Sequence, residues 1–382
     1  MVNCGVLIAA MSLDFGGAET HVIDLATRLS GLGFRVNVAS QGGRLVKRLE
    51  QAGVPHLIAP LHSRAPLSLL AATRILGEIV EGRGVDLFHA HGRIPAWVLT
   101  QVQRSHPTVP LVTTYHGVYT AGFPWNLFTR QGDVCIAVSD DIKSHLLNHL
   151  GFDGARVEII PNGIDTRRFS PAPYPPLREE LVAGDLGPVV ANVSRLDAQF
   201  AETAISLVES LPSLDAQHPG VVGLVVGDGD RLGDVQQACE RCNNLLRRRA
   251  AIAAGGQEDV VPYLLSSDVV VAVARSALEA MACGKPVVLA GEGGFRGALS
   301  AHNVEMARRH NFTARGSSVA TTAGEIGAAV NSLLESSELR AAASALGLEV
   351  VTRDYSWEAL VPRTLAVYEK AFEMKGLGRG RL

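Results

Sequence analysis

Two charged side chains in the second half of the chain could bind a nucleotide. Arg195 ends the stretch "VVANVSR", and Glu279 lies in "RSALEAMACGKPVV", shortly after the apolar run "DVVVAVA". A guanidinium at the end of a buried strand can hold a diphosphate through two hydrogen bonds, and a surface salt bridge is the alternative. A carboxylate one turn into a helix can accept hydrogen bonds from the hydroxyls of a ribose. The pair therefore indicates a nucleotide site.

Glu279 has a second interpretation, as part of a helix cap. Ser276 and Glu279 match a capping box, in which each side chain accepts a hydrogen bond from the other residue's backbone amide, and Gly284 would end that helix. If the segment is a ligand site instead, the exposed amides of Ser276, Ala277 and Leu278 favour a phosphate. The sequence supports both interpretations.

Glycines mark two more strand ends. Gly16 and Gly17 stand just before a helical pattern, where a diglycine can bind a phosphate, with a bare turn as the alternative. They lack the G-x-G-x-x-G spacing of a dinucleotide fingerprint. Gly227 and Gly229 flank Asp228 in a turn whose small residues would let a nucleotide approach.

Histidines end two strands of the first half. The segment "LFHAHG" contains His89 and His91, and "TTYHG" contains His116. An imidazole at the carboxyl end of a strand can donate to a hydroxyl or a phosphate, or transfer a proton, whereas a packed and hydrogen-bonded histidine is the alternative. Placement favours His116 and His91 as site residues.

The composition is that of a globular protein and disfavours nucleic acid as a partner. The 382 residues, 47% of them hydrophobic and 19% charged, predict two or three domains. A net charge of −3 provides no global positive field. The basic run 247–249 is expected on a solvated helix face, and contact with an anionic membrane surface is the alternative.

Cysteine usage and hydropathy indicate a cytoplasmic protein. Five cysteines favour a reducing compartment. Cys239 and Cys242 lack the second pair that a zinc site needs, so we expect no metal site. No apolar run reaches the length of a membrane span, and no charged leader precedes "VLIAAM".

Apolar, β-branched runs alternate with helical patterns in both halves, which is typical of parallel sheets covered by helices on both faces. The expected strands are "CGVLIAA", "RVNVAS", "HLIAP", "VDLFHAHG", "PLVTTYHG", "VCIAVS", "PVVANVSRL", "VVGLVVGDGD", "DVVVAVA", "KPVVLAG" and "NFTARG". We predict an amino-terminal α/β domain over 1–170, a proline-rich linker over 171–187, a carboxyl-terminal α/β domain over 188–355, and a terminal helix within 356–382 that packs back on the first domain. Such sheets bind ligands at the carboxyl ends of their strands.

The motifs "GGAETHVIDLATRL", "HAHG", "TYHG", "AVSDDIKSHL", "VEIIPNGIDTRRFSP", "VSRLD", "VVGDGD" and "ALEAMACGKPVV" follow one another along the chain, and "YSWEALVPRTLAVYE" ends the series. In this order they resemble the GT-B glycosyltransferases of the large retaining family four, over nearly the whole chain. The resemblance implies two Rossmann-like domains facing across a cleft. It also implies a UDP- or GDP-linked sugar held mainly by the second domain, an acceptor held mainly by the first, and transfer with retention and no obligatory metal or cofactor.

The same resemblance assigns roles to individual residues. It places Gly16 and Gly17 beside a phosphate or the acceptor, and His116 near the transferred sugar. It gives Arg195 the donor diphosphate and Glu279 the ribose hydroxyls. Charge on the leaving β-phosphate would then be stabilised by Arg195 and by the amides of the helix start.

The chain departs from the family pattern at two positions. Phe200 stands where the family has a lysine on the same diphosphate, and Val271 stands where it has a second glutamate. The loop after Val271 is expected to run from Ala272 to Arg275. We expect Arg275 or another basic residue to replace the missing cation, with Arg275 as the first candidate.

Three hypotheses follow. The first is a glycosyltransferase that moves a sugar from a UDP- or GDP-sugar, and the second is a GT-B protein that binds a nucleotide sugar or a partner without turnover. A nucleotide-sugar epimerase is a weaker third. A lipid, a glycan, a natural product or a protein could each be the acceptor, and peripheral membrane contact and the oligomeric state stay open.

Overall fold

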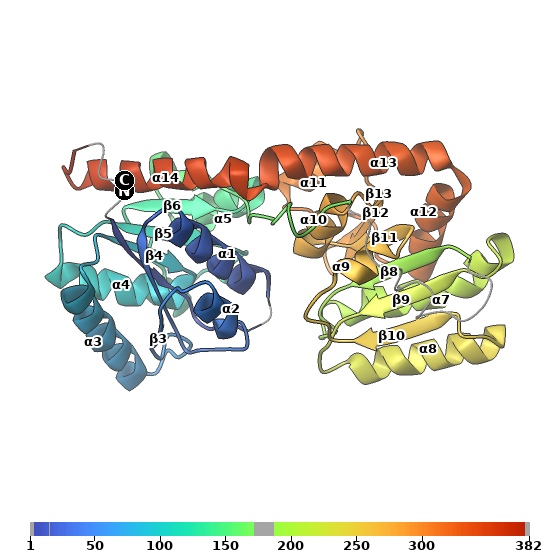
Figure 1. The fold of residues 1–382 in the computed structure, drawn as a ribbon, viewed down its shortest axis with the longest axis horizontal. Coiled ribbons are helices and arrows are strands. Elements are labelled where there is room, and N and C mark those ends of the chain that lie inside the picture. Colours follow the sequence, from blue (N-terminus) through green and yellow to red (C-terminus); the bar gives the residue numbers. More distant parts are fainter. Residues whose placement is uncertain (1–3, 15, 172–186, 379–382) are drawn as a thin grey trace. The chain divides into compact units, whose positions relative to one another are not determined.

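The computed structural model describes residues 4–14, 16–171 and 187–378 (Figure 1). They belong to two compact units: unit 1 is Met1–Gly163 with Trp357–Leu382, and unit 2 is Ile164–Ser356. The chain therefore passes between the units twice. The linker predicted over 171–187 lies almost wholly outside the described residues.

Unit 1 contains a seven-stranded parallel sheet in the order β3-β2-β1-β4-β5-β6-β7. Its elements are β1 (Gly5–Ala9), α1 (Gly17–Gly31), β2 (Arg35–Ser40), α2 (Val46–Gln51), β3 (His56–Ile58), α3 (Pro66–Arg83), β4 (Leu87–His91), α4 (Arg93–Ser105), β5 (Leu111–Tyr115), η1 (Trp125–Phe128), β6 (Val134–Ala137), α5 (Asp140–Leu150), η2 (Gly154–Arg156), β7 (Val157–Ile159) and α14 (Trp357–Met374).

Both faces of this sheet are covered because alternate residues of each strand point to opposite sides. Val6 and Ile8 of β1 pack with residues of α1, α2 and α14, whereas Leu7 packs with residues of α3 and α4. Helix α14, red in Figure 1, lies beside β5 and β6 and buries Trp357 and Tyr368. The last helix of the chain is therefore part of the core of unit 1.

Unit 2 contains a six-stranded sheet in the order β10-β9-β8-β11-β12-β13, parallel except for β13. Its elements are β8 (Val189–Val193), α7 (Ala201–Gln217), β9 (Val222–Val226), α8 (Leu232–Leu246), β10 (Ala251–Gly255), α9 (Val261–Leu265), β11 (Val269–Ala272), α10 (Ala274–Ala282), β12 (Val287–Gly291), β13 (Gly294–Ala298), α11 (Val304–Arg309), α12 (Ala323–Glu335), α13 (Ser337–Val350) and η3 (Val351–Tyr355).

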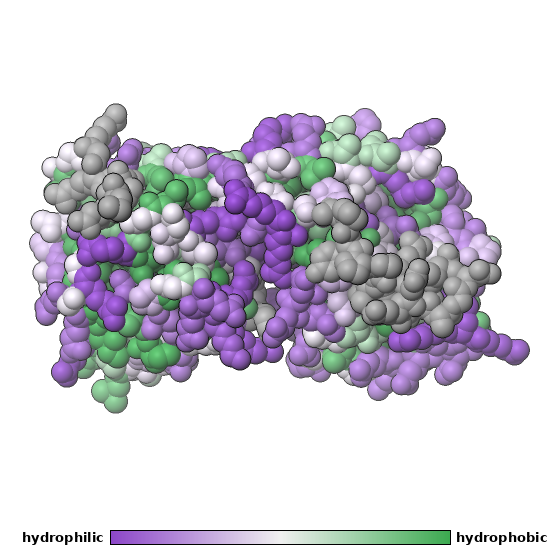
Figure 2. Space-filling model, in the orientation of Figure 1, coloured by the Kyte–Doolittle hydropathy of each residue, from purple (hydrophilic) through white to green (hydrophobic). Residues whose placement is uncertain are grey.

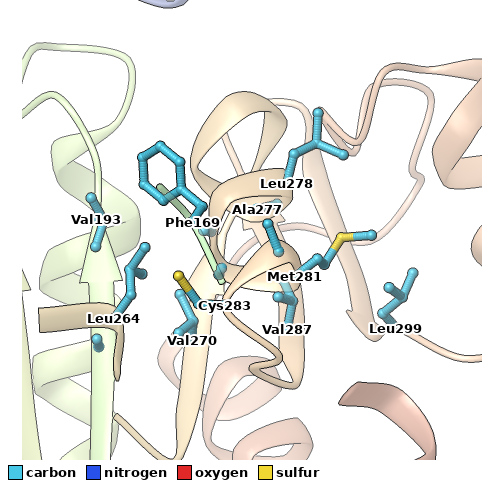
Figure 3. Close-up of a cluster of buried hydrophobic side chains, with 14 of the residues drawn as sticks. Phe169, Val193, Leu264, Val270, Ala277, Leu278, Met281, Cys283, Val287 and Leu299 are labelled. Atoms are coloured by element: carbon cyan, nitrogen blue, oxygen red, sulfur yellow. The ribbon is translucent and has the colours of Figure 1, made fainter. Parts of the chain in front are cut away.

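The helices of unit 2 also lie on both faces of their sheet. Residues of α9, α10 and α11 share one buried cluster, and residues of α7, α8 and α12 share the other. Figure 3 shows Ala277, Leu278 and Met281 of α10 in the first cluster, close to Val270 of β11 and Val287 of β12. Burial of this face fixes α10 on the sheet.

One predicted strand is wrong. Residues 311–316 form no strand, because Asn311, Phe312 and Ala314 have φ of 52°, 54° and 59°, outside the extended region. Phe312 is fully buried, so its apolar character reflects a turn that packs into the core. Strands β10 and β13 were not predicted, because their residues are rich in alanine and glycine and form no β-branched apolar run.

In each sheet, the direction in which the chain adds new strands reverses once. The chain winds outward from β1, returns to β4 and continues the other way, and unit 2 does the same between β8 and β11. At such a switch point the carboxyl ends of the two central strands lead apart and leave room for a ligand. The turns after β1 and β4, and those after β8 and β11, are therefore where a site is expected in each unit.

Candidate functional site

The switch point of unit 2 contains Arg195, as predicted. The residue follows β8, and its side chain is 59% exposed, with Asp197 at 3.6 Å as its ion-pair partner. An exposed pair of this length contributes little to stability. The guanidinium lies over the ring of Phe200, 5.6 Å from its centroid. Phe200 thus supplies a flat apolar face to Arg195 in the place of a second cation.

Gly227 and Gly229 support the turn that carries Arg195. A Cβ at Gly227 would lie 1.9 Å from the carbonyl oxygen of Ser194, and one at Gly229 would lie 2.4 Å from that of Leu196. The Leu196 amide donates to the Asp228 carbonyl at 2.9 Å. The two turns are packed backbone against backbone, and the structure gives these glycines a packing role.

This packing makes Gly227→Ala destabilising. We expect the free energy of unfolding to fall by about 1–3 kcal/mol, because the new methyl group overlaps a backbone oxygen that side-chain rotation cannot move. Gly233→Ala is the matched control, since a Cβ there meets nothing within 4 Å. Denaturant unfolding of both variants measures the effect, and equal stability would contradict the packing role.

Helix α10 begins earlier than the capping box requires, so that hypothesis is wrong. Val273 is the N-cap residue and has no side-chain capping bond, which leaves Ser276 inside the first turn. The start is fixed by tertiary structure, because the amide of Ala274 donates to the Phe312 carbonyl at 2.8 Å. The end of the helix is confirmed, since Gly284 follows its C-cap with φ 70°.

The early start also corrects the predicted phosphate-binding amides. The amide of Ala277 already donates to Val273 at 3.4 Å, and that of Leu278 belongs to the helix interior. Only the amides up to Ser276 lie outside the helix's own hydrogen bonds. A ligand phosphate would therefore approach Arg275 and Ser276.

Glu279 and Arg275 form an ion pair on α10. Arg275 Nε donates to Glu279 Oε1 at 2.8 Å, and the two side chains are 14% and 12% exposed. Arg275 and Glu279, which were both predicted to contact the donor, therefore contact each other. Ligand binding through either side chain has to share or replace this contact.

The loop predicted from Ala272 to Arg275 does not exist. Ala272 ends β11 and Ala274 begins α10, so that one residue, Val273, joins the two elements. Val271 is fully buried inside β11. A carboxylate at that position would lie in the sheet core, so the family's second glutamate has no counterpart at position 271.

The strand ends of unit 1 bring His91 and His116 together, as their placement suggested. His91 Nδ1 lies 2.9 Å from His116 Nε2, and His116 Nδ1 lies 2.8 Å from Asn162 Oδ1. With the Asn162 oxygen as acceptor, His116 donates from Nδ1 and accepts from His91. Asn162, which follows β7, is a site residue that the sequence did not predict. We call these three residues the histidine relay.

His89 is a packed histidine. Its ring nitrogens lie 2.7 Å from Tyr368 Oη and 2.8 Å from Thr114 Oγ1. Burial lowers the pKa of His89 to about 3. The residue therefore stays neutral and links β4 to α14.

Burial also keeps the histidine relay neutral. It lowers the pKa of His116 to about 4, against the opposing effect of the hydrogen bond that His116 donates to Asn162. The pKa of His91 is lowered by burial first and then by the charges of His89, His116 and His21. At neutral pH the relay can accept and donate hydrogen bonds but carries no charge. A neutral, hydrogen-bonded set of side chains is better suited to position a ligand than to transfer a proton.

The lowered pKa of His116 predicts acid sensitivity. Between pH 6.5 and about 4 the unfolded chain binds a proton that folded His116 does not, so stability is complete above pH 6.5 and falls as the pH drops. The loss attributable to His116 is about 3 kcal/mol. Denaturant unfolding across this range measures it. His116→Gln should flatten the slope by about one proton, and an unchanged slope would contradict the assignment.

Gly16 and Gly17 lie at the start of α1. Gly16 is its N-cap and Gly17 its first residue. A Cβ on Gly16 would lie 2.1 Å from Glu19 Oε2. A carboxylate of the chain itself thus occupies the helix start, where it interacts favourably with the helix dipole. This contact supports the turn interpretation of Gly16.

Neither a metal site nor a membrane-spanning helix is present among the described residues. Among the described residues, no group of histidine, cysteine, aspartate or glutamate side chains is arranged to hold a metal ion. In the same part of the chain, every helix falls short of the length and apolarity needed to cross a bilayer.

Comparison with known proteins identifies two family models and several glycosyltransferases that are similar to this chain. Residues 15–168 match the family described as Glycosyltransferase Family 4, and residues 187–336 match the family described as Glycosyl transferases group 1. The phosphatidyl-myo-inositol mannosyltransferase of Mycolicibacterium smegmatis is 27% identical over 95% of this chain and 92% of its own. The D-inositol 3-phosphate glycosyltransferase of Kineococcus radiotolerans is 25% identical over 96% and 93%.

Solved structures show the same fold. A glycosyltransferase from Rickettsia africae superposes with a TM-score of 0.79 at 20% identity, covering 97% of this chain and 99% of its own. Anabaena HepE in complex with UDP and glucose gives a TM-score of 0.73 at 20% identity, over 94% and 99%.

Proposed function

The chain belongs to glycosyltransferase family four and has the GT-B fold, and on that premise we propose that it moves a sugar from a UDP- or GDP-linked donor to an acceptor hydroxyl. We propose further that transfer retains configuration and needs no metal. The observation that carries the proposal is Arg195, an exposed guanidinium beside the switch point of unit 2. The UDP and glucose bound by HepE support a nucleotide-sugar donor.

The proposed chemistry is electrostatic. When the bond between sugar and diphosphate breaks, negative charge grows on the leaving β-phosphate. Arg195 and the first amides of α10 would stabilise that charge more in the transition state than in the ground state. Glu279 would hold the ribose, and Arg275 would supply the second positive charge after its contact with Glu279 rearranges.

The acceptor is proposed to bind in unit 1, with Gly16, Gly17 and His91 beside it and His116 near the transferred sugar. The two relatives named above act, by their names, on phosphatidyl-myo-inositol and on D-inositol 3-phosphate. Inositol compounds are therefore the first acceptors to test. We propose a cytoplasmic enzyme with peripheral membrane contact.

A binding protein without turnover is the second candidate. Phe200 stands at the expected lysine, Val271 is buried in a strand, and Arg275 is engaged by Glu279. Phe200 and the engaged Arg275 reduce the positive charge available to a leaving diphosphate, and Val271 leaves the position of the family's second carboxylate apolar. They favour a protein with little catalysis.

Nucleotide release separates the two candidates. The purified protein is incubated with UDP- and GDP-sugars, with and without inositol phosphates or phosphatidylinositol, and free UDP or GDP is followed. Acceptor-dependent release that persists in EDTA supports the transferase, and the anomeric proton signals of the product test retention. Nucleotide binding without release under every condition supports the binder, and an epimerised donor would indicate the epimerase.

A further inference from the structure

The start of α4 lies at the switch point of unit 1. The helix begins at Arg93, directly after β4 and Gly92, whose φ is 92°. No side chain caps it and no acidic residue lies in its first turn. The partial positive charge of the helix start is therefore uncompensated by these usual means.

Arg93 adds a full positive charge at the same point. Its side chain is buried, with 6% of the residue exposed, and its Nε has no hydrogen-bond partner among the residues that the structure describes. One terminal nitrogen donates to the Thr120 carbonyl at 2.8 Å, and the guanidinium lies 5.2 Å from the Tyr119 ring centroid and 5.8 Å from that of Trp125. The loop after β5 thus folds over Arg93.

The surroundings of Arg93 provide no counter-ion. None of the carboxylates in the described part of the chain pairs with it. Arg64 also contacts this loop, since its guanidinium lies 4.2 Å from the centroid of the Trp125 ring. Burial lowers the pKa of Arg93, and the charge of Arg64 lowers it further against the opposing tyrosines Tyr115 and Tyr119. Two guanidiniums and a helix start therefore share one region.

A buried cation without a carboxylate counter-ion is costly, and a cation at a helix start is unfavourable as well. An oxyanion removes both costs, because it can accept from the free Arg93 Nε and from the first amides of α4. We infer that the start of α4, with Arg93 and Arg64, is the binding site for a phosphate group carried by the acceptor. The inference rests on the proposed function, since it assigns the acceptor's charged group to unit 1.

The phosphate could belong to a soluble acceptor or to a lipid headgroup. The loop that covers Arg93 exposes Phe123 and Leu127, which are 85% and 55% exposed. In Figure 2 hydrophobic residues gather at the lower left, where Figure 1 places α3, and that helix exposes Leu67 and Leu70. Apolar side chains beside a phosphate site suit an amphiphile, so the test includes both sources.

Binding measured without turnover tests the inference. Myo-inositol 1-phosphate and myo-inositol are titrated into the full-length protein by calorimetry. Vesicles of phosphatidylcholine with and without phosphatidylinositol are used in sedimentation assays. We expect at least one phosphate-bearing probe to bind about tenfold or more tighter than its neutral counterpart, as a charge-assisted hydrogen bond requires. If the protein binds the phosphatidylinositol vesicles but not inositol 1-phosphate, the phosphate is that of a lipid. If it binds inositol 1-phosphate, the phosphate headgroup is sufficient for binding.

Three variants decide whether Arg93 is responsible. Arg93→Gln should remove the preference for phosphate, Arg93→Lys should keep most of it, and Arg74→Gln, on an exposed arginine of α3 paired with Glu78, should change nothing. If Arg93 only anchors the loop through Thr120 and the aromatic rings, Arg93→Gln and Arg93→Lys will lower the melting temperature alike and leave the preference unchanged. That result, or equal binding of charged and neutral probes, overturns the inference. UDP binding to each variant is measured separately, so failure of the proposed function would be visible on its own.

Discussion

Arg195→Gln is expected to reduce nucleotide release by about 100- to 1000-fold, the usual effect of removing one preorganised group that stabilises a developing negative charge. The side chain is 59% exposed and its ion pair with Asp197 is long, at 3.6 Å, so the fold should not change. Steady-state release of UDP or GDP, with the unfolding midpoint recorded for each variant, measures the effect.

Two further variants sharpen this result. Arg195→Lys keeps the charge but loses the paired hydrogen bonds, and should fall between the wild type and Arg195→Gln. Arg241→Gln, on an exposed residue of α8, is the control for loss of a surface arginine. If Arg195→Gln and Arg241→Gln behave alike, Arg195 does not contact the diphosphate.

Glu279→Gln should lower both stability and nucleotide affinity. The ion pair with Arg275 is mostly buried, at 14% and 12% side-chain exposure. Removing one partner leaves a buried charge, which typically costs about 3–5 kcal/mol. Denaturant unfolding and UDP titration of the same preparation measure the two effects.

The double variant Arg275→Gln/Glu279→Gln separates structure from binding. Neutralising both partners should recover most of the lost stability, because neither charge of the pair then remains in this mostly buried place. Affinity for UDP should stay low if Glu279 accepts from the ribose hydroxyls. Recovery of affinity together with stability would show that Glu279 acts only through the helix.

Hydrophobic pattern predicted the two sheets because strands buried on both faces read as continuous apolar runs, as in "CGVLIAA" and "DVVVAVA". The pattern failed where tertiary contacts set the backbone. Ser276 matches a capping box, yet the hydrogen bond between Ala274 and Phe312 starts α10 earlier. The turn around Phe312 resembles a strand in sequence because its aromatic side chain is buried.

The candidate site was predictable where a residue lies at the end of its strand or within two residues after it, as His91, His116 and Arg195 do. Asn162 required knowledge that β7 ends near β5 and β6, and Arg93 required the strand order that puts β4 next to β1. Both residues stand after strand ends in "IIPNG" and "HAHGR". A predicted strand order, combined with the list of residues at the strand ends, would have identified both residues. Single motifs did not.

A crystal structure of the protein with UDP or GDP bound tests the central claim most directly. The account predicts electron density for the diphosphate within hydrogen-bond distance of Arg195 and of the first amides of α10, with the ribose beside Glu279. Density for the nucleotide elsewhere in the protein, with Arg195 turned to solvent and the pair of Arg275 and Glu279 intact, would contradict it.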